Sequence, residues 1–200
     1  DGVDLVHEGK NNYGTFTHNS RLSIYGIGPH SAGSTISYAI RIKTTNNDSN
    51  MILVHYGHKF GFSEFTKNIF TLTLDKGNPK LYTDDTSVLE PRNAYKLNDG
   101  NWHDIAVSMP RKSCTLSEVV MYVDGEIVET NIPKNKMHIF FITSGHIGIG
   151  GFGYSHTNFG ESHFLDLKPY TGNIDYFYLW GRTIGDDDLP LLSKKHYTIF

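Results

Sequence analysis

The stretch TISYAIRIK, residues 35–43, decides the fold class of this chain. Large apolar side chains alternate along it with smaller or polar ones, which is the period of a β-strand whose two faces meet different surroundings. We therefore predict a half-buried strand here, whose core face carries Ile36, Tyr38, Ile40 and Ile42.

Runs of β-branched and aromatic residues, separated by clusters of Gly, Asn, Asp and Pro, recur along the whole chain. They predict further strands at 21–25, 51–56, 69–74, 80–83, 102–109, 119–123, 126–130, 146–149 and 174–180. The segment KGNP, residues 76–79, predicts a turn that joins two of these strands in a hairpin. Turns at such intervals favour an all-β fold with two antiparallel sheets packed as a sandwich.

Helical periodicity is nearly absent from the chain. One short helical turn near the C-terminus is expected at 184–194, where Asp186 and Asp187 suit the first turn and Pro190 limits the length.

Composition narrows the class of protein. The 200 residues have a mass of 22.6 kDa and are 13% aromatic, so we expect one packed domain over residues 1–200 rather than a disordered chain. The net charge of −3 offers no basic field for nucleic acid, and no apolar run is long enough to insert in a membrane. Because the chain begins at Asp1 without a signal peptide, we expect that it is excised from a larger protein.

The cysteine and glycosylation patterns say little about the compartment. Cys114 is the single cysteine, so an internal disulfide is impossible and stability must come from packing. Asn47-Asp48-Ser49 matches the N-glycosylation pattern, but such tripeptides also arise by chance, and the modification of Asn47 stays open.

Three segments in a fixed order resemble one family. They are NDGNWHDIAV at 98–107, MYVDGE at 121–126, and TGNIDYFYLW at 171–180, which GRTI and an acidic turn follow. Together they resemble the laminin G-like, pentraxin-like jelly roll of the concanavalin A-like lectin and glucanase superfamily. This resemblance implies a jelly-roll sandwich that binds glycans, proteins or lipid headgroups at its loops or on a sheet face, in secreted or cell-surface proteins.

Most residues of these three segments also have a purely structural explanation. We predict that Trp102 lies in the core, that Asp124-Gly125 forms a hairpin turn, and that Gly172 permits a close approach of two backbones.

A glycoside hydrolase of this superfamily would carry Glu-x-Asp-x-x-Glu on one strand, and the chain lacks that pattern. The nearest match begins at Asp124, in the predicted turn, and its Glu126 and Glu129 have opposite strand parity. Cys114 has no nucleophile signature around it. We therefore predict that the protein is not an enzyme.

Calcium is a second question, because pentraxin-like and many laminin G-like domains hold it at a loop rim. Asn68 lies where the pentraxin pattern has a ligand amide, but the segment GFGYSH at 151–156 lacks the acidic residues that pentraxins supply there. We expect no cofactor and no pentraxin-type calcium site. A different calcium site at Asp84 and Asp85, or at Asp166, stays open.

Eleven histidines are many for this length, and four of them cluster in two predicted loops. These are His55 and His58 in one loop, and His156 and His163 around Glu161 in the other. Zinc binding, a pH-sensitive binding surface and plain surface polarity all stay open, and we assign no metal ligand.

The segment FGYSHTNFGESHFLDLKPY, residues 152–170, is longer than an ordinary connection between strands, and such insertions are usually functional or disordered. Its aromatic rings alternate with amides, carboxylates and imidazoles, the mixture that sugar binding uses. The predicted ligand-binding residues are Tyr154, His156, Asn158, Phe159, Glu161, His163 and Asp166, together with His55 and His58. The alternative is that this loop folds over a sheet edge and buries its own rings.

These observations favour a non-catalytic glycan-binding or adhesion module of an extracellular or cell-surface protein, with a glycan or glycoprotein as partner. The alternative is a structural or protein-interaction domain that contacts a protein receptor. A polysaccharide-cleaving enzyme is a third interpretation, which requires two carboxylates that face each other in a cleft.

Overall fold

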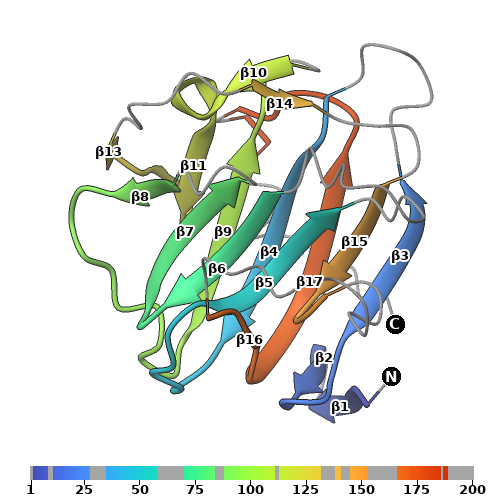
Figure 1. Cartoon of the computed structure of the whole chain (residues 1–200). Coiled ribbons are helices and arrows are strands. Elements are labelled where there is room, and N and C mark those ends of the chain that lie inside the picture. The colour runs from blue at the N-terminus through green and yellow to red at the C-terminus, as the bar shows by residue number, and fades with distance from the viewer. Residues whose placement is uncertain are drawn as a thin grey trace.

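Two large β-sheets stack face to face in the part of the chain that the structure describes (Figure 1). The computed structural model describes residues 2–8, 11–27, 35–57, 70–83, 88–110, 113–131, 138–140, 145–152, 166–185 and 187–188. In Figure 1 the strands of one sheet, such as β5 (Met51–Gly57), lie in front of the strands of the other, such as β4 (Ser37–Lys43). The predicted antiparallel sandwich is confirmed.

The first sheet has seven strands, and all neighbours in it are antiparallel. In spatial order they are β1 (Asp4–Glu8), β2 (Asn11–Phe16), β17 (Gly172–Trp180), β4, β9 (Trp102–Ser108), β11 (Val120–Val123) and β12 (Glu126–Ile127). The last strand of the chain, β17, therefore lies inside the sheet, between two strands from the N-terminal quarter.

The second sheet has eight strands. In spatial order seven of them are β13 (Thr130–Asn131), β8 (Val88–Pro91), β7 (Asn78–Thr83), β6 (Phe70–Asp75), β5, β15 (Gly145–Ile149) and β3 (Leu22–Ile27). The eighth, β16 (Lys168–Pro169), pairs with β5 in parallel. A small separate sheet joins β10 (Ser113–Thr115) to β14 (His138–Phe140).

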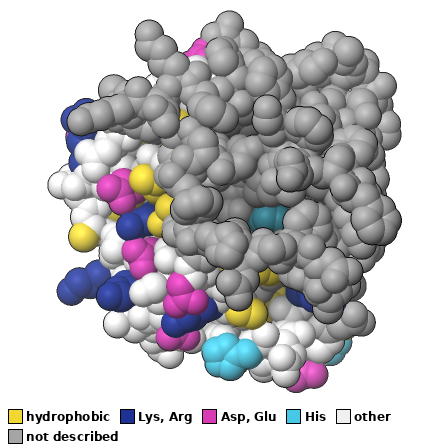
Figure 2. All heavy atoms as spheres, viewed as in Figure 1, with side chains coloured by type: hydrophobic (Ala, Val, Ile, Leu, Met, Phe, Trp, Pro, Cys, Tyr) yellow, Lys and Arg dark blue, Asp and Glu magenta, His cyan; other side chains and the backbone are white. Residues whose placement is uncertain are grey.

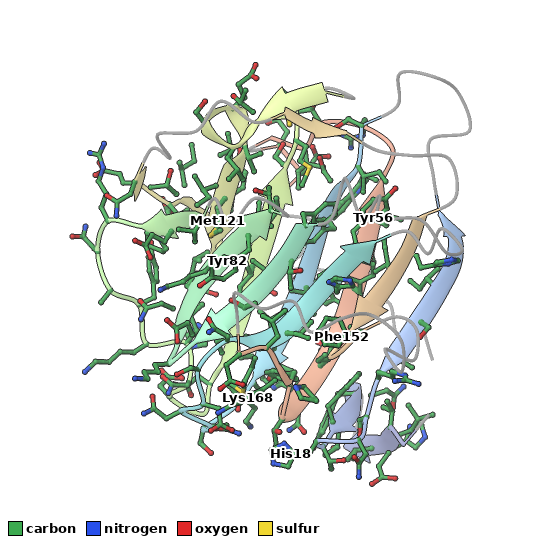
Figure 3. All side chains as sticks on the ribbon, viewed as in Figure 1. His18, Tyr56, Tyr82, Met121, Phe152 and Lys168 are labelled. Atoms are coloured by element: carbon green, nitrogen blue, oxygen red, sulfur yellow. The ribbon has the colours of Figure 1, made fainter. Side chains whose placement is uncertain are left out.

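The space between the sheets is filled by the apolar faces that the alternation predicted. Ile36, Tyr38, Ile40 and Ile42 all belong to one buried cluster, and each is at most 4% exposed. Tyr38 of β4 stacks on Phe70 of the opposite sheet at 5.7 Å between ring centroids, with the ring planes 6° apart. Phe70 in turn stacks on Tyr56 at 4.9 Å. Tyr56 and Met121, both labelled in Figure 3, come from different sheets, and both are fully buried.

Two hairpin turns have the backbone that two-residue β-turns require. Asp124 and Gly125 join β11 to β12 with φ values of 52° and 87°, which confirms the predicted turn. Lys76 and Gly77 join β6 to β7 with φ values of 51° and 88°. The second turn is shorter than the predicted 76–79, because Asn78 and Pro79 already pair with β6.

One detail of the predicted secondary structure is wrong. The predicted strand at 126–130 divides into β12 of the first sheet and β13 of the second, because the chain crosses between the sheets at Val128. The one helical element among the described residues is a 3-10 turn at Leu116–Glu118, in the middle of the chain, where the Glu118 carboxylate accepts a hydrogen bond from the Thr115 backbone. Most of the helical turn expected at 184–194 falls outside the described residues. No described helix is long and apolar enough to cross a membrane.

Trp102 is not a core residue, which corrects the sequence prediction. It shares its strand parity with Asp104, whereas Ile105 and Val107, of the opposite parity, pack in the core. Trp102 is partly exposed on the side of the seven-stranded sheet that faces away from the core.

Gly172 permits a close backbone approach, as predicted. Its φ is 148°, and a Cβ atom there would lie 2.6 Å from the Lys43 carbonyl oxygen and 2.6 Å from the Tyr170 hydroxyl. The Tyr170 hydroxyl donates a hydrogen bond to that same carbonyl at 3.0 Å. Glycine is therefore required where β17 begins to pair with β4.

We predict that Gly172→Ala lowers the free energy of unfolding by about 2 kcal/mol or more. The alanine would be strained at this φ, and its Cβ would clash with the Lys43 carbonyl oxygen, which is backbone and cannot move aside. Gly181→Ala is the matched control, since a Cβ at Gly181 meets no atom within 4 Å. Urea unfolding of both variants measures the difference. Equal stability of Gly172→Ala and wild type would contradict the close approach.

Candidate functional site

Most of the predicted ligand-binding residues lie outside the described part of the chain. These are His58, Tyr154, His156, Asn158, Phe159, Glu161 and His163. Asn68, Asp84 and Asp85, considered for calcium, also lie outside it. These assignments remain predictions.

His55 and Asp166 are the two predicted site residues that the structure describes, and they have different surroundings. His55 is only 3% exposed, its Nδ1 lies 2.9 Å from the Thr71 hydroxyl, and its ring meets the edge of Phe152. The prediction that His55 lies in a surface loop is therefore wrong, because the strand run continues to Gly57. Asp166 is exposed, and its carboxylate lies 3.8 Å from the Lys168 ammonium.

The described residues bring a different set of polar and aromatic side chains together, on the side of the seven-stranded sheet that faces away from the core. We call this side the outer face. Strand alternation places on it side chains from β2, β4, β9 and β17, and those that form the site are Tyr13, Arg41, Lys43, Trp102, Asp104, Asn173, Asp175 and Tyr176.

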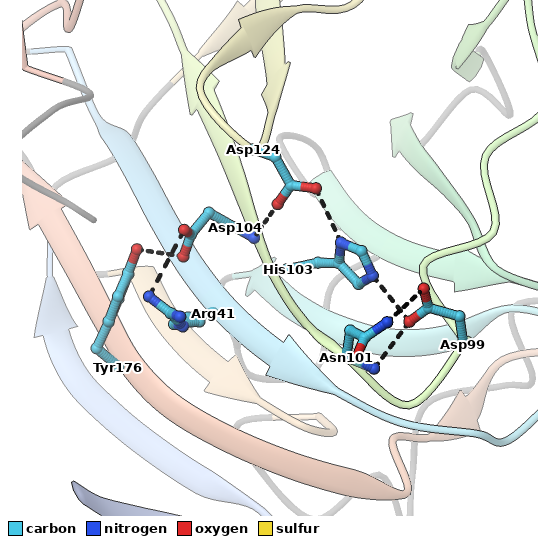
Figure 4. A network of polar contacts seen from close by, with 7 residues as sticks. All are labelled: Arg41, Asp99, Asn101, His103, Asp104, Asp124 and Tyr176. Atoms are coloured by element: carbon cyan, nitrogen blue, oxygen red, sulfur yellow. Dashed lines mark hydrogen bonds and ion pairs between the residues drawn. The ribbon is translucent and has the colours of Figure 1, made fainter.

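Arg41 is the charged centre of the outer face (Figure 4). Its Nη1 lies 3.8 Å from the Asp104 carboxylate and its Nε lies 3.7 Å from the Asp175 carboxylate. The guanidinium is thus held between carboxylates from the two strands that flank β4. This arrangement offsets the charge of Arg41 and fixes its side chain.

Asp104 is also bound by Tyr176, whose hydroxyl donates a hydrogen bond to it at 2.5 Å. Burial raises the pKa of Asp104, and the hydrogen bond from Tyr176 and the charge of Arg41 only partly reverse that effect. Burial and the neighbouring Asp104 carboxylate raise the pKa of Tyr176. Tyr176 therefore remains a hydrogen-bond donor at any physiological pH.

His103 joins the start of β9 to the β11–β12 turn. Its Nδ1 lies 2.8 Å from the Asp124 carboxylate and its Nε2 lies 3.0 Å from the Asp99 carboxylate (Figure 4). Burial acts to lower the pKa of His103, but the two carboxylates together raise it above its ordinary value. Hydrogen bonds from Asn101 and His103 lower the pKa of Asp99 to about 2.

Trp102 stands on the outer face with its ring surrounded by polar neighbours. The Tyr13 ring meets it edge-on at 5.6 Å, and the Arg41 guanidinium and the Lys43 ammonium each lie 5.9 Å from its ring centroid. A large, partly exposed ring beside cations is a typical element of a ligand-binding surface.

An open pocket of about 310 Å³ adjoins Trp102 at the end of β4. We call it the Lys43 pocket. It is lined by hydroxyl, amide and glycine residues and by one lysine: Lys43, Thr44, Thr45, Asn46, Gly100, Thr171, Gly172 and Asn173. Lys43 lines the pocket and is also paired with Trp102 in the β4–β9 ladder, with its ammonium 5.9 Å from the centroid of the Trp102 ring, so the ring lies beside the pocket.

Charge on the opposite face of the molecule is mixed. Figure 2 shows basic and acidic side chains beside each other on the described part of that face. Lys80, for example, lies 2.9 Å from Asp75 and 3.2 Å from Glu90. Across the described ranges, no group of three or more His, Cys, Asp or Glu side chains is arranged to hold a metal ion.

The sequence did not predict the outer face as a site. Strand parity was the available signal, because Trp102 and Asp104 share a face opposite to that of Ile105. The contacts of Arg41 with Asp104 and Asp175 join segments far apart in the chain, and no local sequence pattern predicts such contacts.

Comparison with known proteins identifies the family. The family model described as "Laminin G domain" matches residues 42–182, more than half of the chain. The chain belongs to the laminin G domain family. The match runs from Ile42 of β4 past the end of β17, so it includes all outer-face residues of this laminin G domain named above except Tyr13 and Arg41. No curated protein sequence matches the chain.

Solved structures share the fold of this laminin G domain at low sequence identity. Domain 4 of AbnA, a GH43 extracellular arabinanase from Geobacillus stearothermophilus, in complex with arabinotriose, superposes with a TM-score of 0.66 and 14% identity. That match covers 97% of this chain and 82% of the other. The CBM40 of the Ruminococcus gnavus IT-sialidase, bound to α2,3 sialyllactose, has a TM-score of 0.52 and 16% identity, over 86% and 97% of the two chains.

A laminin is also among the similar structures. Domains LG4–5 of the mouse laminin α1 chain match with a TM-score of 0.56 and 18% identity. The match covers 86% of this chain and 42% of the mouse fragment.

We predict that the His103 contacts stabilise the fold most strongly at low pH. Because the folded-state pKa is raised, the charged imidazole contributes fully below its unfolded pKa of about 6.5, and this contribution is lost as the pH rises through the folded-state pKa. Wild type should therefore exceed His103→Gln in Tm at pH 5.5, and the difference should narrow at pH 8.5.

Thermal unfolding of both proteins at the two pH values measures this effect. His7→Gln is the control, since the His7 ring bonds to the Asn12 amide rather than to carboxylates. A His103→Gln difference that is the same at pH 5.5 and pH 8.5 would show that its charge adds nothing.

We predict that Tyr176→Phe lowers the free energy of unfolding by about 1–3 kcal/mol, because the mostly buried Asp104 carboxylate loses its hydroxyl donor. Tyr95→Phe is the control, since the Tyr95 hydroxyl has no hydrogen bond to any described residue. Urea unfolding at pH 7 compares the two variants, and equal losses would contradict a specific role for the Tyr176 hydroxyl.

Proposed function

We propose that this laminin G domain is a non-catalytic carbohydrate-binding module that acts on the outside of a cell as part of a larger protein. The observation that carries the proposal is the position of the Trp102 ring beside the Lys43 pocket. It combines a large aromatic ring with hydroxyl and amide side chains in an open pocket. Sugar rings pack their C–H faces on aromatic rings, and their hydroxyls exchange hydrogen bonds with amides and hydroxyls.

The similar folds support this proposal. Domain 4 of AbnA is described in complex with arabinotriose, and the R. gnavus CBM40 is described with sialyllactose. Both are single domains of carbohydrate-active proteins, and each match covers most of both chains. Saccharide binding is thus a function that this architecture carries elsewhere.

The state of the described carboxylates supports a non-catalytic role. Asp104 and Asp175 are acidic residues of the outer face, and their carboxylates lie 3.8 Å and 3.7 Å from the Arg41 guanidinium. Glu126 belongs to β12 of one sheet, whereas Glu129 leads into β13 of the other and lies 3.8 Å from Arg92. A retaining or inverting hydrolase needs two carboxylates that are free to face one scissile bond.

A protein receptor is the second candidate partner, and an aromatic cluster at the other end of the outer face favours it. Tyr178 and Trp180 are partly exposed there, beside Tyr122, Tyr176 and Ile184. Partly exposed aromatic side chains of this kind are enriched in protein interfaces.

We predict that the isolated domain binds at least one oligosaccharide on a glycan array, tested with and without calcium. Trp102→Leu should weaken binding of the same glycan about three- to tenfold, because it removes the ring surface, whereas Trp102→Phe should retain most of it. Circular dichroism of both variants verifies that they fold.

No bound glycan in either condition, together with tight binding of a protein ligand, would overturn the carbohydrate proposal in favour of the receptor. If Trp102→Leu leaves glycan binding unchanged, the glycan binds at a surface other than the outer face.

A further inference from the structure

Both ring nitrogens of His103 face a carboxylate. Nδ1 lies 2.8 Å from Asp124 and Nε2 lies 3.0 Å from Asp99, and Figure 4 shows the ring between these two side chains. A charged imidazole donates a hydrogen bond from each nitrogen, whereas a neutral imidazole has one N–H and a lone pair on the other nitrogen. Because a lone pair cannot bond to a carboxylate oxygen, the two contacts coexist only while His103 is charged.

The charged groups that contact His103 in the described part of the chain are these two carboxylates. The partner of His103 in β4, Ile42, is apolar. The next residue of β9, Asp104, has its carboxylate on the outer face, beside Arg41. The protonation of His103 is therefore coupled directly to Asp99 and Asp124.

The two carboxylates differ in what else holds them. Asp124 is bonded to β9 itself, since its carboxylate accepts a hydrogen bond from the Asp104 N–H at 2.8 Å and its own N–H donates to the Asp104 carbonyl at 2.8 Å. The other hydrogen bonds of the Asp99 carboxylate come from the backbone and the side chain of Asn101, at 2.8 Å and 2.9 Å. Those bonds lie within one short segment, residues 98–101. When His103 loses its charge, the contact with Asp99 is therefore the easier one to break.

The 98–101 segment forms part of the wall of the Lys43 pocket. Gly100, the residue after Asp99, lines the pocket, and its N–H donates to the carbonyl of Thr44, another lining residue, at 3.0 Å. The Asn98 side chain donates to the carbonyl of Asn46, also in the lining, at 3.3 Å. A displacement of Asp99 therefore acts directly on this wall.

From these contacts we propose that His103 is a positioning residue that makes the wall of the Lys43 pocket depend on pH. Charged, His103 holds Asp99 and the 98–101 segment in place; neutral, it keeps its bond to Asp124 and releases Asp99. Because the two carboxylates raise the pKa of His103 above its ordinary value, the release occurs above about pH 6.5. The release itself needs no ligand, and its consequence for binding rests on the proposed carbohydrate-binding function.

Nuclear magnetic resonance of the ¹⁵N-labelled protein between about pH 5.5 and pH 8.5 tests the inference. The ¹⁵N shifts of the His103 ring distinguish the charged imidazole from its two neutral forms. Above the titration midpoint we expect the neutral form protonated at Nδ1, which keeps the bond to Asp124. The amide signal of Gly100 is expected to shift with the same midpoint as the His103 ring.

His103→Gln should abolish the pH-dependent shift of the Gly100 amide, because glutamine does not titrate in this range. His7→Gln is the matched control, since His7 lies in β1 and its ring bonds to Asn12, and this variant should keep the shift.

Three results would overturn the inference. They are a Gly100 signal that does not follow the His103 titration, a neutral His103 ring protonated at Nε2, and a Gly100 shift that persists in His103→Gln. The first two are measured on the wild-type protein, so the test does not depend on the folding of a variant.

Binding gives a second readout, with a glycan that the array identifies. Isothermal titration calorimetry should give an affinity about two- to threefold higher at about pH 5.5 than at about pH 8.5, because the held wall is pre-organised. His103→Gln should lose this difference. Equal affinities at the two pH values would overturn the effect on binding and leave the carbohydrate-binding function standing. If no glycan binds, the proposed function fails, and the resonance titration still decides whether His103 controls the wall.

Discussion

The stacking of Tyr38 on Phe70, and of Phe70 on Tyr56, is the interaction on which the rest of the structure depends. It holds the two sheets together through their alternating apolar faces, and the chain has no disulfide that could replace it. Once Tyr38 points into the core, strand geometry forces Arg41 and Lys43 to point outward. The candidate site is thus the reverse side of the same strand that forms the core.

The two cations of the outer face differ in whether carboxylates surround them. Arg41 lies between carboxylates from both neighbouring strands, so the charged row across β9, β4 and β17 carries no net positive charge. Lys43, one step further along the same face, is not bracketed in this way among the described residues. The contrast between these two cations concentrates unbalanced charge beside the pocket rather than over the whole sheet.

Much of the fold was predictable from local patterns, and the reasons are specific. The period of two predicts a strand that carries Ile36, Tyr38, Ile40 and Ile42 on one face, because a helix has no such period. The Asp124-Gly125 pair predicts a turn, because Asp and Gly tolerate the left-handed backbone that both residues adopt. The split of residues 126–130 between two sheets was not predictable, because nothing local records which sheet a two-residue strand joins.

The site was less predictable than the fold. The sequence predicts Trp102 in the core because tryptophan is usually buried, although its shared strand parity with Asp104 favours the opposite face. The prediction of His55 in a loop fails because the ends of strands are the least certain feature of a sequence pattern, and this strand continues to Gly57. The seven residues at 58 and 154–163 that the sequence favoured lie outside the described structure, so the outer face adds a second surface to the prediction.

The position of β17 between β2 and β4 has a consequence for how the protein is made. During synthesis, residues 172–180 leave the ribosome long after the strands on either side of them. Until then, β4 and β2 each present an unpaired edge, and open edges of this kind are where nascent chains pair wrongly with one another. Completion of the seven-stranded sheet is therefore a late, long-range step, and the surface that carries Lys43 and Asn173 exists only after it.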